Sequence, residues 1–490
     1  MPKEERQEAL QPILDALSLP PSTYFPLATS SEKCCRVLRI APHESIVFNT
    51  KARCPVMLIC EVQREEYDLA QIDAHLGEPS PAADGASASA EAVQLKDVGD
   101  APPTLVEKKK EPWGKKVDRL KRTSSLASAV PGWELRSFFV KSNDDLRQEV
   151  FVMQMIRYFQ SIWPTESVWL NAYHIEATVG RARPCDCAHA HRWPGCSHAC
   201  VMRVSDHPVP VTAPGPGHPP TTDYPSPDHR LPIPRSPPPS PDRRPHPPCL
   251  PWCTMAHPPL ALLRHARQGP DTGLVEAITA SSDLDRLKKT KEYTNLRQLF
   301  IQRYGAPGTA GFLAAQDKFC KSLAGYAVVM WLLLLRDRHN GNLMLDEEGH
   351  YFHIDFGFIL GHSTGKQIGG MIECSAFKLT QEYIDLLDGR GSPVYEKFCA
   401  ACCAAMAASH AHAATICSMV EIVGTRSSFP CFQVFPVQKV IPKLRKRLMM
   451  DLPASAVPTE FRKIIDQKAA GHWGSRWYDK FQAKLAGYAV

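Results

Sequence analysis

The strongest constraint on the fold is a pair of short polar motifs on either side of a predicted hairpin. The first motif is the run RDRHNGNL at 336–343, and the second is the run HIDFG at 353–357. Strand-like residues at 343–345 and 351–354 enclose the turn 346–349. A hairpin brings the residues at its two open ends together, so the two motifs are predicted to share one site.

The residue types in these motifs suit phosphoryl transfer, a reaction that needs positioning and charge neutralisation more than covalent help. Protein kinases place a catalytic-loop Asp beside the acceptor hydroxyl, and they hold metal ions with an Asn five residues later and with the Asp of an Asp-Phe-Gly run. Here Asn342 follows Asp337 by five residues, and Asp355 lies thirteen residues beyond Asn342. This spacing predicts a kinase site that uses ATP and divalent metal.

The loop carries Asp-Arg-His where protein kinases carry His-Arg-Asp. His339 consequently lies on the acceptor side of Asp337. There it is predicted to act as a base or to stabilise the transferring phosphoryl group. The alternative is that His339 does not touch the reacting groups and only hydrogen-bonds the residues that do.

A cation and a carboxylate upstream complete the predicted site. Residues 135–140 are strand-like, and the run SNDD at 142–145 suits a helix start. Apolar residues at helical spacing then predict a helix to about residue 162. Lys141 ends the strand and Glu149 lies on the helix, an arrangement with which kinases aim an ammonium group at ATP phosphates. An ordinary surface lysine is the alternative.

Composition divides the chain into an N-terminal stub at 1–36, a small lobe at 37–178, an insertion at 179–270, and a hinge with a larger lobe at 271–490. The small lobe is predicted to contain strands at 37–40 and 56–62, a polar turn at 48–55, and a flexible linker at 77–112.

The insertion cannot build a hydrophobic core. It holds 23 of the 44 prolines, 9 of the 19 histidines and 6 cysteines, without a phenylalanine, lysine or glutamate. We predict that it is disordered. Its bias suggests translated non-coding sequence such as a retained intron, and a genuine translated insertion is the alternative. The spacing of its Cys and His residues between 185 and 200 matches no closed four-ligand zinc pattern.

The larger lobe is predicted to be mostly helical around a strand-like centre at 343–360. The apolar run 327–335 is too short to span a membrane and indicates a buried core helix. Residues 396–422 predict an alanine-rich helix or helix pair, whose cysteines and histidines favour packing and surface roles over metal binding. The aromatic residues of 473–490 fit either a helix at a membrane surface or one packed on the larger lobe.

The formal net charge of +6 does not indicate a nucleic-acid partner. Ten arginines and five aspartates place +5 of it in the insertion, and the remainder of the chain has no basic stripe. The start of the sequence lacks the pattern of a secretory signal, so the cysteines are expected to be reduced thiols in the cytoplasm.

The quoted motifs, together with the run FVKSNDDLRQE at 139–149, resemble the phosphatidylinositol 3-/4-kinase superfamily. The runs SAFKLT at 375–380 and FPCF at 429–432, and Glu149 itself, look like the type III phosphatidylinositol 4-kinases of the beta type. The resemblance covers about 37–75, 112–178 and 271–490. It implies an α+β, bilobal, protein-kinase-like fold with a small antiparallel-sheet N-lobe and a larger, mostly helical C-lobe.

The resemblance also implies a role for each candidate residue. Lys141 contacts ATP phosphate and Glu149 holds it, while Asp337 and His339 serve the acceptor hydroxyl. The metal ligands, for magnesium or manganese, are Asn342 and Asp355. The remaining implied ATP contacts are Thr50 and Lys51 of the turn 49–55, and the hinge residues Glu276 to Ile278.

The implied acceptor is phosphatidylinositol in a membrane, phosphorylated on its 4-hydroxyl. Between Asp355 and Thr380 the fixed cations are Lys366 and Lys378, expected on an activation loop that faces the head group. Inositides that already carry phosphates would need more positive charge there.

The resemblance further implies a peripheral location on Golgi or trans-Golgi membranes, with small GTPases or calcium sensors as regulators. Two alternatives remain: a protein kinase of the lipid-kinase-like group, and a nucleotide-binding module whose catalysis the insertion impairs.

Overall fold

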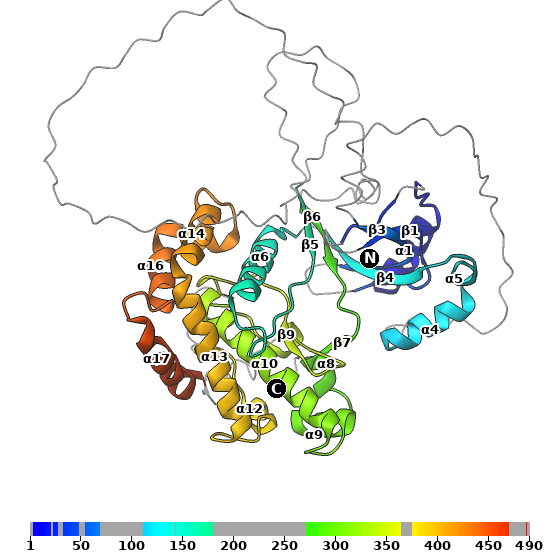
Figure 1. The fold of residues 1–490 in the computed structure, drawn as a ribbon. Coiled ribbons are helices and arrows are strands. Elements are labelled where there is room, and N and C mark those ends of the chain that lie inside the picture. The colour runs from blue at the N-terminus through cyan, green and yellow to red at the C-terminus, as the bar shows by residue number, and fades with distance from the viewer. Residues whose placement is uncertain are drawn as a thin grey trace, which may run out of the picture.

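The chain forms two lobes, a small one built on a sheet and a larger one built mostly of helices (Figure 1). This confirms the predicted α+β, bilobal architecture. The computed structural model describes residues 3–20, 23–27, 33–48, 54–68, 111–142, 144–179, 271–363, 375–469 and 487.

The small lobe is a six-stranded antiparallel sheet in the order β1-β3-β4-β6-β5, with β2 paired to β3. The predicted strands are all present, and several are longer than the sequence pattern suggested. The strands are β1 (Lys33–Ile40), β2 (Ile46–Val47), β3 (Val56–Asp68), β4 (Trp133–Ser142), β5 (Ile175–Val179) and β6 (Asp271–Glu276).

Side chains alternate between the two faces of this sheet because successive strand residues point in opposite directions. One face is covered by α1 (Lys3–Asp15) and by Phe25, whose ring lies 5.5 Å from that of Phe138. On the opposite face, the part of the sheet around Leu135 packs against α4 (Trp113–Thr123), which is followed by α5 (Ser125–Ala129). The part of this face around Phe139 packs against the core of the larger lobe. Lys141 lies two residues after Phe139 on the same face, so it faces the cleft between the lobes.

A cluster of buried charges fixes α4 to the small lobe. Lys116 is 3% exposed and donates to Glu44 at 2.8 Å, while Arg119 bridges Glu44 and Glu111. Burial alone would raise the pKa of Glu44, but its bonds to Arg119 and Lys116 lower it to about 2. The charges are therefore paired rather than isolated, the condition under which ions are tolerated in a protein interior.

Strands β5 and β6 form one hairpin although ninety-one residues separate them. Val179 pairs with Asp271, and the register continues without a shift to the pair Ile175 and Val275. The strand thus extends one residue into the predicted insertion. Both ends of the segment 180–270 therefore lie at neighbouring points on the sheet edge.

Several predictions concern residues outside those that the structure describes. They are the turn residues Thr50 and Lys51, most of the linker 77–112, the insertion from 180 to 270, Lys366, and the helix at 473–490 with the exception of residue 487.

Helix α6 (Arg147–Ile162) follows β4 as predicted and packs between the sheet and the larger lobe (Figure 1). Asp145 accepts a hydrogen bond from the backbone amide of Arg147 at 3.1 Å, which satisfies one free amide of the first turn. The inner face of the helix includes Met153, Ile156 and Phe159, each no more than 2% exposed.

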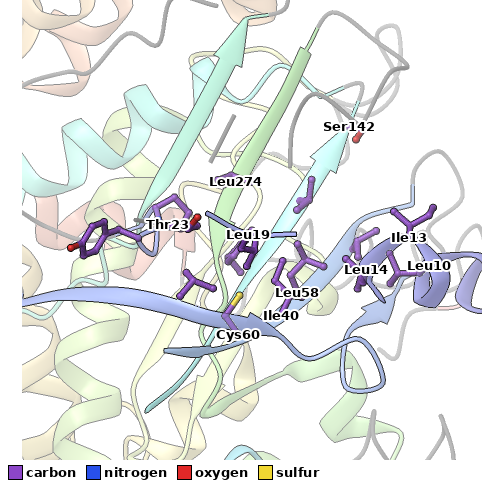
Figure 2. Close-up of a pocket in the computed structure, with 16 residues that line it drawn as sticks. Leu10, Ile13, Leu14, Leu19, Thr23, Ile40, Leu58, Cys60, Ser142 and Leu274 are labelled. Carbon is purple, nitrogen blue, oxygen red and sulfur yellow. The ribbon is translucent and has the colours of Figure 1, made fainter. Parts of the chain in front are cut away.

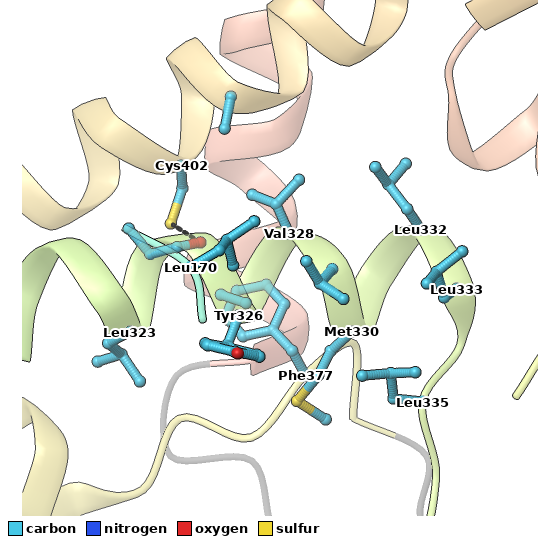
Figure 3. Close-up of a cluster of buried hydrophobic side chains, with 14 of the residues drawn as sticks. Leu170, Leu323, Tyr326, Val328, Met330, Leu332, Leu333, Leu335, Phe377 and Cys402 are labelled. Carbon is cyan, nitrogen blue, oxygen red and sulfur yellow. Dashed lines mark hydrogen bonds between the residues drawn. The ribbon is translucent and has the colours of Figure 1, made fainter. Parts of the chain in front are cut away.

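Helix α10 (Ala310–Leu333) is the centre of the larger lobe, as its apolar sequence predicted. Its side chains pack against Leu170, Phe377 and Cys402 from three other segments (Figure 3). Thr309 caps its first turn, and Leu334 ends it in a left-handed conformation with φ of 47°. The chain therefore turns sharply into the loop that carries the first polar motif.

The remaining elements surround α10. A small antiparallel sheet of β7, β8 and β9 follows the hinge; β8 and β9 form the predicted hairpin, whereas β7 was not predicted. These elements are β7 (Ser281–Asp283), α8 (Leu284–Lys288), α9 (Leu296–Tyr304), β8 (Leu343–Asp346), β9 (Tyr351–His353), α12 (Gln381–Leu386), α15 (Pro430–Val434), α16 (Val437–Arg447), α17 (Val457–Ile464) and the single turns Asn340–Asn342, Ala454–Ala456 and Ile465–Ala469.

The alanine-rich region is a helix pair, α13 (Pro393–Ala411) and α14 (Ala413–Gly424). Within the described ranges, no single helix has the length and apolarity to cross a membrane, although α13 and α14 meet that test together with a bend of 70° between them. Cys399 and Cys402 of α13 are buried, and Cys402 Sγ lies 3.8 Å from the carbonyl of Ala324.

Candidate active site

The loop between α10 and β8 brings the first polar motif to the cleft. Asp337 has a φ of 62°, a left-handed conformation that costs a residue with a side chain about 1–2 kcal/mol. The amide of Asn342 donates from its Nδ2 to the Asp337 carbonyl at 3.0 Å, and its backbone N–H donates to the His339 carbonyl at 3.0 Å. These bonds close the loop on itself, so its strain is held by local contacts.

The two polar motifs meet, as the hairpin predicted. The backbone N–H of Ile354 donates to the Asn342 carbonyl at 3.2 Å, which places Asp355 directly beside the loop. Asp355 is also left-handed, with φ of 58°, and it is exposed. Gly357 N–H donates to Asp355 Oδ1 at 3.4 Å.

Two buried side chains hold the backbone around Asp355. Arg338 is 1% exposed; its guanidinium donates to the carbonyls of Ile354, at 2.8 Å, and of Asp355. Gln148 of α6 is 2% exposed and donates to the next two carbonyls, those of Phe356 at 3.0 Å and Gly357 at 2.8 Å. Four consecutive carbonyls, those of residues 354 to 357, therefore accept bonds from two side chains that come from different segments.

The sequence interpretation assigned no role to Arg338 or Gln148. Both lie inside the quoted motifs, next to residues with predicted roles. Their partners are distant in the chain, and neither hydrophobic periodicity nor motif spacing reports such contacts.

Asn342 and Asp355 fit a magnesium site that a nucleotide completes. The Asn342 side chain uses its Nδ2 on the loop, which leaves an amide oxygen as its metal ligand, and Asp355 offers a carboxylate. Mg²⁺ takes oxygen ligands and is commonly held by one or two carboxylates together with substrate phosphates. Among the residues that the structure describes, no group of three or more His, Cys, Asp or Glu side chains could hold a metal by itself.

His339 and Asp337, the two residues predicted to serve the acceptor, lie close together in the loop. His339 Nε2 lies 3.9 Å from Asp337 Oδ2, and the histidine is 8% exposed. Burial lowers the pKa of His339 below its ordinary value, although the nearby Asp337 carboxylate opposes that shift. The shift favours the neutral imidazole, the form that can accept a proton, and both roles of His339 remain predictions.

The predicted ion pair of the small lobe is present. Lys141 Nζ lies 3.6 Å from Glu149 Oε1, and the glutamate is 6% exposed. Burial raises the pKa of Glu149 to about 7; Lys141 opposes this shift, whereas Asp355 and Asp144 add to it. Gln148, the chain neighbour of Glu149, bonds to the carbonyls of Phe356 and Gly357, so the ion pair lies near the predicted metal ligand Asp355.

A glycine allows α6 to approach the sheet beside Lys141. Gly273 of β6 pairs with Lys141, and a Cβ placed on it would lie 2.4 Å from Leu146 Cδ1 and 2.9 Å from the Glu176 carbonyl. The start of α6 therefore sits against the bare backbone of β6. A larger residue at 273 would push Glu149 away from the lysine.

The predicted hinge leads from β6 toward β7. Glu276 Oε2 accepts a bond from the backbone of His174 at 2.9 Å, and the Ile278 carbonyl accepts one from Ser281 at 2.7 Å. The segment runs from the small-lobe sheet to the sheet of β7, β8 and β9, and its role as a hinge that contacts adenine remains a prediction.

Lys378 does not occupy the position expected from the sequence. It is 5% exposed, and its ammonium donates to the Arg338 carbonyl at 3.0 Å and to Asn340 Oδ1 at 3.2 Å. The predicted lysine facing a head group is instead a buried support beneath the catalytic loop. The reason is that the flanking residues Phe377 and Leu379, both 0% exposed, anchor this segment in the core.

A cavity of about 230 Å³ lies elsewhere, between α1 and the small-lobe sheet (Figure 2). Leu10 and Leu14 of α1 line it together with Leu58 and Leu274 of the sheet. These sheet residues point to the face opposite Lys141. The cavity is therefore separate from the predicted nucleotide cleft.

Comparisons with known proteins agree with this geometry. The model of the family "Phosphatidylinositol 3- and 4-kinase" matches residues 255–433. The chain is 28% identical over 378 residues to phosphatidylinositol 4-kinase beta of Rattus norvegicus and of Mus musculus, and likewise to that of Xenopus tropicalis. Each match covers 76% of this chain and 34% of the relative, so the chain spans about a third of the length of these curated relatives. The resemblance inferred from the motifs is confirmed.

Proposed function

We propose that this chain, which carries a phosphatidylinositol 3- and 4-kinase domain, transfers the γ-phosphoryl group of ATP to the 4-hydroxyl of phosphatidylinositol. The observation that carries the proposal is the meeting of three predicted elements in one cleft. These are the Lys141–Glu149 pair, the Asp337–His339 loop, and the Asn342–Asp355 ligand pair.

Each residue has a distinct task in this mechanism. Bound magnesium-ATP supplies the phosphoryl group and neutralises the charge that develops during its transfer. Lys141, aimed by Glu149, would donate to phosphate oxygens, and Asn342 with Asp355 would hold the metal. Asp337 would orient the acceptor hydroxyl, and His339 would accept its proton at the neutral imidazole or stabilise the transferring group.

The identity of the acceptor rests on the similarity to proteins named phosphatidylinositol 4-kinase beta. We extend the proposal to a peripheral location on the cytoplasmic face of Golgi membranes, where the acceptor is available, and to regulation by small GTPases or calcium sensors. Imaging of a tagged chain against Golgi markers tests the location, and uniform cytoplasmic signal would contradict it.

The decisive experiment measures transfer of labelled phosphate to phosphatidylinositol liposomes, with the ring position of the product mapped. Because Val179 pairs with Asp271, residues 180–270 can be replaced by a two-residue Asn-Gly turn that suits an antiparallel hairpin. The natural chain and this shortened chain are compared, each with Asp355→Ala and with Asp451→Ala, an exposed control outside the site.

We expect phosphatidylinositol 4-phosphate from at least the shortened chain, its loss in Asp355→Ala, and its retention in Asp451→Ala. Product at another ring position would overturn the 4-kinase assignment alone. Folded, nucleotide-binding proteins of both lengths that phosphorylate no lipid would overturn the lipid kinase proposal. Phosphorylation of an added protein or peptide would then favour a protein kinase, and nucleotide binding without turnover would favour an impaired module.

A further inference from the structure

Gln148 connects three segments that are far apart in the sequence. It lies on α6 beside Glu149 and is 2% exposed. Its Nε2 donates to the carbonyls of Phe356 and Gly357, and its Oε1 accepts the backbone N–H of Cys431, at the start of α15, at 3.1 Å. Both ends of the amide are thus engaged with backbone groups.

The backbone that Gln148 holds is the one that sets the direction of the Asp355 carboxylate. Asp355 is left-handed, a conformation that persists in a residue with a side chain when surrounding contacts determine it. Arg338 fixes the carbonyls on one side of this residue, and Gln148 fixes the two that follow. Without Gln148 the peptide groups after Asp355 would lose their buried donor.

The same helix carries Glu149, the partner of Lys141. A shift of α6 therefore moves the carboxylate that aims the lysine and the amide that fixes the Asp355 segment at the same time. The segment after Asp355 is itself packed on both Tyr173 and Arg338, because the ring of Phe356 stacks on Tyr173 at 6.4 Å and the Arg338 guanidinium lies 5.6 Å from the Phe356 ring.

We propose that Gln148 is a positioning residue that holds Asp355 in its metal-binding orientation and couples it to the position of α6. The inference rests on the proposed function in that Asp355 is taken as a metal ligand. Gln148 acts through the backbone and touches neither nucleotide nor acceptor. The proposal therefore predicts that loss of Gln148 weakens binding of metal-bound nucleotide and leaves binding in the adenine pocket unchanged.

The test uses two variants of nearly the same size as glutamine. Gln148→Leu removes both hydrogen-bonding functions, and Gln148→Glu keeps the acceptor for Cys431 but loses the donor to the two carbonyls. The matched control is Gln316→Leu in α10. Gln316 is also 2% exposed and donates to the Leu386 carbonyl at 2.8 Å and to Asp388 at 2.9 Å, remote from the site.

The first measurement is amide hydrogen exchange of the nucleotide-free proteins. We expect faster exchange across 354–360 and at Cys431 in Gln148→Leu, faster exchange in 354–360 alone in Gln148→Glu, and neither change in Gln316→Leu. Wild-type exchange in both Gln148 variants would overturn the proposal. Because nucleotide, metal and lipid are all absent, this result does not depend on the proposed function.

The second measurement compares the affinity for magnesium-ATP with the affinity for adenosine in the absence of metal. We expect both Gln148 variants to weaken binding of magnesium-ATP by about tenfold, the usual scale for a residue that orients a metal ligand, and to leave metal-free adenosine binding within about twofold. Equal weakening of both would overturn the proposal, since it would indicate general damage. If the variants show a magnesium-specific defect but the natural protein phosphorylates no lipid, the role of Gln148 is supported and the proposal of a lipid acceptor is overturned.

Discussion

The two sides of the cleft differ in how completely they are assembled without a nucleotide. On the larger-lobe side, four consecutive carbonyls around Asp355 are bound by the buried side chains of Arg338 and Gln148. On the small-lobe side, Lys141 and Glu149 are 3.6 Å apart, and burial raises the pKa of Glu149 to about 7. The backbone around Asp355 is thus held by buried donors without a nucleotide, whereas on the lysine side burial disfavours the carboxylate form of Glu149.

The largest loss of turnover is expected when Asp355, the proposed metal ligand, is replaced. Asp355→Asn keeps the shape of the side chain and removes its charge, so turnover should fall by about three orders of magnitude, because metal-dependent charge stabilisation amounts to several kcal/mol. The measurement is kcat with labelled ATP, alongside the melting temperature. A fall of less than tenfold in a fully folded protein would mean that Asp355 is not a metal ligand.

The next largest effect is expected for Arg338, whose guanidinium holds the backbone of Asp355. Arg338→Met should lower the free energy of unfolding by about 3 kcal/mol, since three buried carbonyls (336, 354 and 355) lose their donor, and should reduce turnover by about 100-fold. Denaturant unfolding and kcat are measured together. Arg447→Met is the matched control, because Arg447 is also buried and donates to the Leu332 carbonyl at 3.0 Å. Equal losses of turnover in the two variants would show that only stability matters.

The comparison is sharpened by the pH dependence of the small-lobe pair. The pKa of Glu149 in the folded protein, about 7, lies above its ordinary value of 4.5, so proton binding favours the folded state. This contribution is complete below pH 4.5 and is lost as pH rises through 7, with an upper bound of about 3 kcal/mol.

The unfolding free energy of the natural chain should therefore fall relative to that of Glu149→Gln between pH 5 and pH 8, by about 2 kcal/mol. Denaturant unfolding without nucleotide gives this difference at each pH. Glu421→Gln, an exposed substitution on α14, serves as the control and should show no such trend. A constant difference for Glu149→Gln would mean that the carboxylate is fully ionised across this range.

The smallest loss of activity is expected for substitution of Lys378, whose ammonium bonds to Arg338 and Asn340 in the polar loop. Lys378→Met should lower ATP hydrolysis and lipid phosphorylation equally, by about tenfold, with a smaller loss in Lys378→Arg. Exposed Lys463→Met is the control. Loss of lipid phosphorylation with intact ATP hydrolysis would restore the role at the head group that the sequence suggested.

The sequence by itself determined the two lobes, the main strands of the small lobe, the helix after β4, the central hairpin, and the candidate residues Lys141, Glu149, Asp337, Asn342 and Asp355. These features depend on local patterns: strand and helix periodicity, a short hairpin, and fixed spacings within motifs. The hairpin of β8 and β9 is short enough that joining its ends places Asn342 beside Asp355.

Only the tertiary structure decided what holds these residues in place. Gln148 meets Phe356 across 208 residues and Cys431 across 283, and Lys378 meets the Arg338 carbonyl across 40. A glutamine, an arginine and a lysine are residues that a sequence usually places on the surface. Here each is buried and bonded to backbone groups that folding brings to it, and contacts of that kind are a property of the packed core rather than of any local pattern.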